Sequence, residues 1–169
     1  MRKSEITKMP SYFDRYINLV PDIEVLDALK QYDVSNLHAI KENLLSKADY
    51  AYAPDKWTVK QLMQHINDTE RIFAYRALRM GRMDPSPLTS FDENEYIKNC
   101  DANKRTMDSL IDEFDVIRKS TIILYENLND DAMVFIGVAS GIENSALAIG
   151  FTIVGHFLHH MKVLEERYF

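Results

Sequence analysis

The chain has 169 residues, of which 46% are hydrophobic and 27% charged, and its formal net charge is −6. This length suits one domain with its own core, and a single cysteine excludes a disulfide scaffold or a multi-cysteine zinc module. The mild acidity argues against a nucleic-acid partner. Five glycines and five prolines are few for a sheet with many turns, so the composition favours a few long helices. We treat residues 1–169 as one domain, with residues 1–20 as an N-terminal extension that packs on the rest.

No targeting signal is evident in the sequence. The N-terminus carries positive charge but lacks the apolar run and the small-residue cleavage site of a signal peptide. The segment from Asn144 to Met161 contains no Asp, Glu, Lys or Arg, yet it holds three histidines and two glycines, which are costly in lipid. We therefore expect a helix buried in protein, no membrane partner and a cytoplasmic location.

The sequence predicts two helices in the first half of the chain. One runs from Asp22 to Lys47, after Pro21, which suits a first-turn position. The other begins at Thr58, where Thr58 and Gln61 have the spacing of a capping box. It ends near Gly81–Pro85, where glycine and proline stop a helix.

Two further helices are predicted over Lys104–Leu128 and Asn144–Tyr168. The former has the strongest periodicity in the chain, with apolar residues every three or four positions. Connections of unequal length join the helices, and the longest of them is Asp84–Asn103. Helices of about 25 residues are about 37 Å long at 1.5 Å per residue. The predicted fold is therefore all-α, an up-and-down-type four-helix bundle.

A pair of histidines in the last predicted helix is the strongest chemical signal. His156 and His160 are four residues apart on the apolar stripe, so both rings point inward from one face. A helix presents two imidazoles to one metal ion in this way. The alternative is a pair of core histidines that are hydrogen-bonded to carbonyls or hydroxyls. His65, in the second predicted helix, would supply a third nitrogen, and three histidines without a fourth protein ligand resemble an open catalytic site.

The other polar candidates have weaker signals. Asp68 follows His65 by three residues and is predicted either to hydrogen-bond a ligand imidazole or to act as a base, with a solvated carboxylate as the equal alternative. We expect His38 to be exposed, and His159 to lie behind the ligands or at the surface. Surface positions are also expected for Arg118 and Tyr96, with substrate contact as the alternative, and surface ion pairs for Glu70 and Arg71.

Four segments in chain order resemble motifs of the DinB-like superfamily of metal-binding four-helix bundles. They are WTVKQLMQHINDTER (57–71), FDENEY (91–96), EFDVIRKST (113–121) and GHFLHH (155–160), the last followed by ERY (166–168). Each motif is short, but their order and separations together make a specific match, which extends over about residues 20–169.

The resemblance implies a bundle, usually a homodimer, that holds one divalent metal ion with His65, His156 and His160. Histidine-only sites accept several ions, so the metal could be Ni, Zn, Mn or Fe. Related members include low-molecular-weight thiol S-transferases and proteins classed as metal-dependent hydrolases. The expected partner is a small molecule, such as a low-molecular-weight thiol.

Three functions follow from such a site. The first is a thiol transferase in stress or detoxification, which needs a pocket for a charged thiol, faced by Arg118 or Arg71. The second is a metal-dependent hydrolase with a carboxylate as general base, for which Asp68 is the nearest candidate. The third is a non-catalytic, metal-stabilised dimeric bundle, whose metal would be sealed from solvent.

Overall fold

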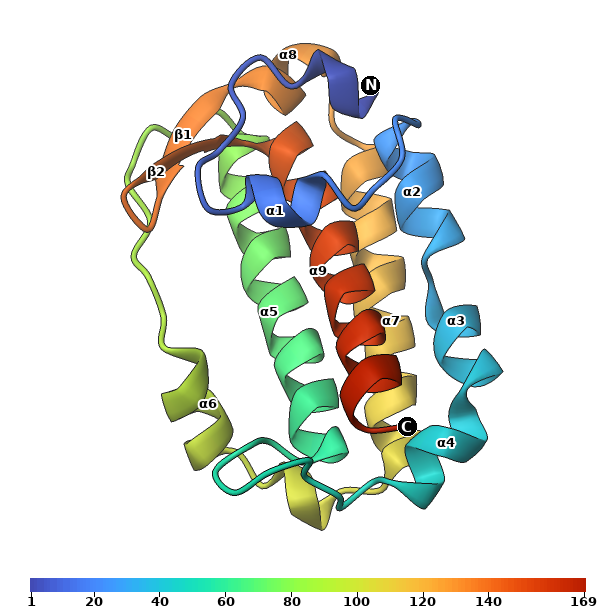
Figure 1. The fold of residues 1–169 in the computed structure, drawn as a ribbon. Helices are drawn as coiled ribbons and strands as arrows, with labels where there is room; N and C mark the ends of the chain where they lie inside the picture. The colour runs from blue at the N-terminus through green and yellow to red at the C-terminus, as the bar shows by residue number, and fades with distance from the viewer.

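Three long helices form most of the bundle in the computed structural model, which describes residues 1–169. They are α5 (Val59–Met80), α7 (Met107–Glu126) and α9 (Ala146–Arg167), and α5 packs against both others (Figure 1). All three agree closely with the helices predicted from periodicity. Three short helices in succession complete the bundle: α2 (Val25–Gln31), α3 (Val34–Ala39) and α4 (Lys41–Ser46). The predicted four-helix bundle is confirmed.

The prediction of a single helix over 22–47 is wrong, because the helical conformation is interrupted twice there. Tyr32 leaves the helical region with ψ 62°, and the side chain of Asp33 accepts a hydrogen bond from the Ser35 amide at 2.8 Å. Aspartate offers the backbone this alternative to a continuous helix, and it caps the start of α3 instead. The second break lies at Ile40, which ends α3 and precedes α4.

The capping box at the start of α5 is confirmed. The Gln61 amide donates to Thr58 Oγ1 at 3.2 Å, and the Thr58 amide donates to Gln61 Oε1 at 2.9 Å. The two residues satisfy each other's backbone groups and set the first turn of the helix that carries His65.

The bundle departs from a strictly alternating order at one connection. Both α5 and α7 run upward in Figure 1, whereas α2–α4 and α9 run downward. The segment predicted as a long loop after α5 returns along the outside of the bundle and contains α6 (Glu93–Asn99) and η2 (Ala102–Lys104). The side chain of Asp92 caps α6 by accepting from two backbone amides.

The connection between α7 and α9 contains structure that the sequence did not predict. It holds α8 (Asp130–Val134) and an antiparallel hairpin of β1 (Ile136–Ala139) and β2 (Ile142–Ser145). Ser140 and Gly141 form its turn with φ of 55° and 75°, as in the primed turns that suit hairpins. Four-residue strands are too short for period-two alternation to reveal them.

The N-terminal segment lies across the bundle. It holds η1 (Lys3–Glu5) and α1 (Asp14–Ile17), and α1 packs on α9 (Figure 1). Gly155 is required at the crossing, because a Cβ there would overlap the carbonyl group of Tyr16. The close approach brings the side chains of the α1 segment next to His156.

Two apolar clusters fill the interior, of 20 and 13 buried residues, at opposite ends of the long helices. The N-terminal part of α9 belongs to the larger cluster and its C-terminal part to the smaller one. By length and hydropathy α9 alone would be able to span a membrane, but 72% of its most apolar window is buried in the bundle.

Between the two clusters lies a buried ion pair. Arg118 Nε and Nη2 donate to the two carboxylate oxygens of Glu70, each at 2.8 Å, and the side chains are 1% and 3% exposed. Arg118 Nη1 donates to the carbonyls of Leu29 and Tyr32, where the chain breaks after α2. The surface positions expected for Arg118 and Glu70 are wrong, because this pair joins α5, α7 and α2 inside the protein.

We expect Gly155→Ala to destabilise the protein by about 1–3 kcal/mol, since the added methyl group meets backbone atoms rather than a flexible side chain. Urea denaturation followed by circular dichroism measures the change. Gly137→Ala is the control, because its new Cβ would meet the flexible Met80 side chain at 3.1 Å. Equal midpoints for Gly155→Ala and the wild type would contradict the close crossing.

Arg118→Met is expected to lower the free energy of unfolding by about 3–5 kcal/mol, because Glu70 would remain buried without its partner. The double variant Glu70→Met/Arg118→Met should recover part of this loss, since it leaves no unpaired charge. The same denaturation experiment tests both, and a double variant less stable than Arg118→Met would argue against the pair as the cause.

Candidate functional site

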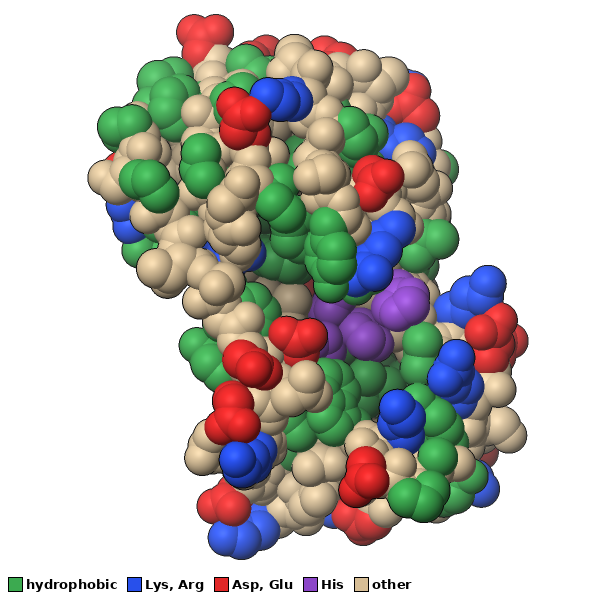
Figure 2. Space-filling view, turned by 60° about the vertical axis from the view of Figure 1, so that its left-hand side comes forward, with side chains coloured by type: hydrophobic (Ala, Val, Ile, Leu, Met, Phe, Trp, Pro, Cys, Tyr) green, Lys and Arg blue, Asp and Glu red, His purple; other side chains and the backbone are tan.

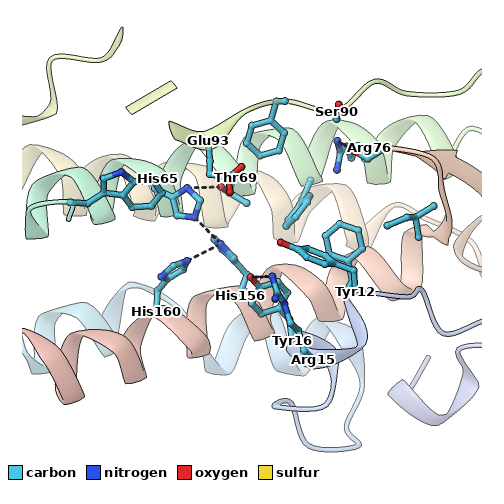
Figure 3. A pocket seen from close by; sticks show the side chains of 16 residues that line it. Tyr12, Arg15, Tyr16, His65, Thr69, Arg76, Ser90, Glu93, His156 and His160 are labelled. Carbon is cyan, nitrogen blue, oxygen red and sulfur yellow. Dashed lines mark hydrogen bonds between the residues drawn. The ribbon is translucent and has the colours of Figure 1, made fainter. Parts of the chain in front are cut away.

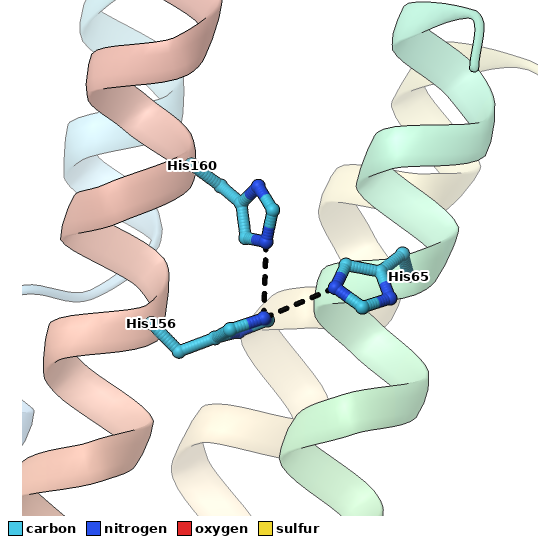
Figure 4. A group of neighbouring side chains, drawn as sticks. All are labelled: His65, His156 and His160. Carbon is cyan, nitrogen blue, oxygen red and sulfur yellow. Dashed lines mark hydrogen bonds between the residues drawn. The ribbon is translucent and has the colours of Figure 1, made fainter. Parts of the chain in front are cut away.

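Three buried histidines meet between α5 and α9. His65 comes from α5, and His156 and His160 come from successive turns of α9 (Figure 4). His156 Nε2 lies 3.0 Å from Nε2 of His65 and 3.0 Å from Nε2 of His160. One nitrogen from each ring falls within 4.8 Å of the others, so the structure brings together the three residues predicted as metal ligands.

Burial keeps the three rings neutral. It lowers the pKa of His65 to about 4, with a smaller contribution from His159. It also lowers the pKa of His156 and of His160 well below the ordinary value, and the neighbouring histidines add to this. Neutral imidazoles have the free lone pair that metal binding requires.

The chemistry of this donor set fits a divalent metal ion. A neutral imidazole nitrogen either donates one hydrogen bond or accepts one, so His156 Nε2 cannot pair conventionally with both neighbours. A cation would accept all three lone pairs at once. Ligand nitrogens at 2.0–2.1 Å from a tetrahedral zinc ion lie about 3.3 Å apart, which is close to the two separations of 3.0 Å seen here.

The second ring nitrogens have unequal surroundings. His65 Nδ1 lies 3.4 Å from Thr69 Oγ1, one turn further along α5. His160 Nδ1 is buried without a hydrogen-bond partner. The ring of Trp57 lies 4.8 Å from that of His65 and shields it on one side.

The histidines open into a cavity of about 440 Å³ (Figure 3). Figure 2 shows histidine side chains at the base of a hollow, with apolar side chains around them and charged ones at its rim. The cavity has four walls. The α1 segment contributes Tyr12, Phe13, Arg15 and Tyr16; α5 contributes Thr69, Phe73 and Arg76; the segment before and at α6 contributes Ser90, Phe91 and Glu93; the hairpin contributes Ser140 and Ile142.

Asp68 does not join the histidines. Its carboxylate accepts a hydrogen bond from Gln64 Nε2 at 2.9 Å and lies 3.7 Å from Arg71 Nη1. Arg71 in turn pairs with Glu113 on α7. Asp68 therefore belongs to a polar network between α5 and α7, and Thr69 is the residue next to the imidazole of His65.

The remaining candidates lie outside the cavity. His38 is exposed, as expected, and His159 is half-buried with its ring 5.4 Å from that of Tyr16. Tyr96 is 47% exposed on α6. Neither Arg118 nor Arg71 lines the cavity, so the prediction that one of them contacts a charged substrate there is wrong.

Sequence reasoning missed the three charged residues that line the cavity, Arg15, Arg76 and Glu93. Arg76 follows His65 by eleven residues, which is three helical turns on the same face of α5, and that periodicity was a usable signal. Glu93 lies within the FDENEY segment, but only the return of this segment along the bundle brings its carboxylate to the cavity. Burial raises the pKa of Tyr16, and the charge of the neighbouring Arg15 partly offsets this increase.

Comparison with known proteins gives a family and a fold. The sequence model of the DinB superfamily matches residues 26–164. A solved structure, YfiT from Bacillus subtilis, has a TM-score of 0.71 and 18% sequence identity, and covers 91% of this chain and 84% of its own. It is described as a probable metal-dependent hydrolase with an unusual four-helix bundle topology. No curated protein sequence matches this chain.

We expect His65→Ala and His156→Ala each to lose most of the bound divalent metal, because each removes one of three converging nitrogen ligands. Elemental analysis of the purified proteins measures metal per chain. His38→Ala, which changes an exposed histidine, should keep its metal. Undiminished metal in both cavity variants would rule out the site.

Proposed function

The chain belongs to the DinB superfamily, and we propose that it is a metal-dependent hydrolase acting on a small molecule. The observation that carries this proposal is a carboxylate, Glu93, in the same cavity as the three histidine nitrogens. A divalent ion held by His65, His156 and His160 would supply Lewis-acid chemistry, lowering the pKa of a coordinated water and polarising a carbonyl oxygen. The protein of similar fold from Bacillus subtilis is described as a probable metal-dependent hydrolase.

In this proposal Glu93 is the general base. Its carboxylate takes one proton from water as the water oxygen forms a bond to the acyl carbon of the substrate. The same proton then passes to the leaving oxygen or nitrogen as the bond from the acyl carbon breaks. One water is consumed, and an acid and an alcohol or amine are released.

The open cavity favours an enzyme over a purely structural metal site. Closed structural sites use four protein ligands, whereas catalytic sites leave positions for water and substrate. Here three histidines face a cavity that reaches the surface (Figure 2). This arrangement speaks against the sealed, non-catalytic bundle.

A thiol transferase is the second candidate, and the cations of the cavity favour it. Arg76 lines the interior and Arg15 the rim, so a charged thiol would find cationic partners other than Arg118 and Arg71. Incubating the metal-loaded protein with cellular thiols and an alkylating dye tests this candidate. Thiol-dependent dye conjugation without ester hydrolysis would place it ahead of the hydrolase. The homodimer and the cytoplasmic location remain predictions.

Glu93→Gln is expected to lower kcat for ester hydrolysis by about 100-fold or more with metal content unchanged, because the amide cannot accept the proton. The assay uses the metal-loaded protein and a panel of chromogenic esters and anilides. Glu95→Gln, on the exposed side of the same helix, is the control and should retain the wild-type rate. No hydrolysis by the wild type, or full activity of Glu93→Gln, would contradict this mechanism.

A further inference from the structure

Arg76 is a buried cation without an acidic partner. Its side chain is 4% exposed, and both of its hydrogen bonds leave from Nη2, to the carbonyl oxygen of Thr89 at 3.0 Å and to Ser140 Oγ at 2.8 Å. No carboxylate forms an ion pair with it, whereas the equally buried Arg118 pairs with Glu70 through two hydrogen bonds. Burying an unpaired charge is unfavourable, so the fold maintains this guanidinium at a cost.

The guanidinium has unused donors, and the Arg76 side chain lines the cavity as well as a smaller outer hollow beside Tyr75 and Arg79. Nη1 and Nε make no hydrogen bond within the protein, and neither atom is sealed from solvent. Figure 3 shows Arg76 at the end of the cavity away from His160, beside Ser90. The unused donors are therefore available to a molecule that enters the cavity.

Its surroundings hold Arg76 in place. The rings of Phe73 and Phe91 lie 5.7 and 5.8 Å from the guanidinium carbon, within cation–π distance. Ser140 has a φ of 55° in the hairpin turn, where glycine or asparagine would be less strained, and its hydroxyl accepts from Arg76. Ser140 is thus a positioning residue for the guanidinium.

One aromatic ring separates this cation from the histidines. The centroid of Phe73 lies 6.2 Å from that of His156 and 5.7 Å from the guanidinium carbon of Arg76. A ligand that contacts both ends would lie along Phe73, with Phe13 and Ile142 also lining its path. This geometry suits an elongated molecule with an apolar middle.

We propose that Arg76 binds a carboxylate of the substrate, whose reacting bond lies at the histidines on the far side of Phe73. The substrate class is then a small, partly apolar carboxylic acid that carries a second acyl group, such as a half-ester or an N-acyl amino acid. Arg76 is the only buried guanidinium that lines the cavity, since Arg15 is exposed at the rim, and one buried guanidinium matches one negative charge better than a phosphate dianion. The location of the reacting bond rests on the proposed function, but the binding of the carboxylate does not.

The only tryptophan of the chain provides a direct binding signal. Trp57 lines the same cavity, so its fluorescence reports a ligand there without any reaction. The zinc-loaded full chain is titrated with 4-phenylbutyrate, with the neutral 4-phenylbutyramide and with phenyl phosphate. We expect the carboxylate to bind at least about tenfold more tightly than the amide, the size of a charge-assisted hydrogen bond, and more tightly than the phosphate ester.

Arg76→Gln should remove the preference for the carboxylate, and Arg82→Gln, which removes an exposed charge near the end of the same helix, should keep it. The titrations are repeated with chelator-treated protein, because a carboxylate could also bind the metal. A preference that persists without metal comes from Arg76. Should Arg76→Gln fail to fold by circular dichroism, Arg76→Lys and Ser140→Ala replace it, and each should reduce the ratio of the two affinities.

Equal binding of acid and amide by the wild type, an unchanged preference in the Arg76 and Ser140 variants, or tighter binding of the phosphate ester would overturn the proposal. These outcomes are independent of catalysis. If the protein hydrolyses no ester but shows the Arg76-dependent preference for the carboxylate, only the proposed hydrolase activity is refuted. If it hydrolyses neutral esters without that preference, only the proposed binding of a carboxylate by Arg76 is refuted.

Discussion

A layer of buried polar groups across the middle of the bundle is the constraint on which the rest of the structure depends. Apolar clusters fill both ends, and between them α5, α7 and α9 carry histidines, an ion pair and threonine hydroxyls. Each such group must find a partner or a ligand, because a buried polar atom left unpaired destabilises the fold. Arg118 and Glu70 satisfy each other on one side of this layer. On the other side His65 and His156 converge without enough protein partners, and the cavity opens there.

Three of the four walls of that cavity come from segments outside the long helices of the bundle, and α5 supplies the fourth. The α1 segment reaches α9 because Gly155 permits the close crossing, and this places the Tyr16 ring 5.4 Å from the His156 ring and nearly perpendicular to it. The hairpin contributes Ser140, and the return of the chain between α5 and α7 contributes Glu93. The irregular segments thus enclose the histidines in a cavity that the long helices alone do not form.

Local signals account for what could be predicted. The apolar stripe and the capping box of α5 involve residues within one or two turns, and so does the spacing of His156 and His160 on one face of α9. Such patterns are readable because a helix repeats every 3.6 residues whatever surrounds it. The long helices and the histidine pair were accordingly found; His65 was joined to the pair from its place in the second predicted helix, and the family motif strengthened that assignment. The break after Tyr32 was missed because a single aspartate cap competes there with a continuing helical pattern.

The sequence by itself thus determined the long helices of the bundle and the three histidines that meet in it. Only the tertiary structure decided that Arg118 is paired with Glu70, that Arg76 is unpaired, and that Glu93 rather than Asp68 lies in the cavity. The physical reason is that the role of a charged side chain depends on the groups that pair with it. Those partners lie tens of residues away along the chain, and only the packing of α5 against α7, α9, the hairpin and the returning segment brings them together or keeps them apart.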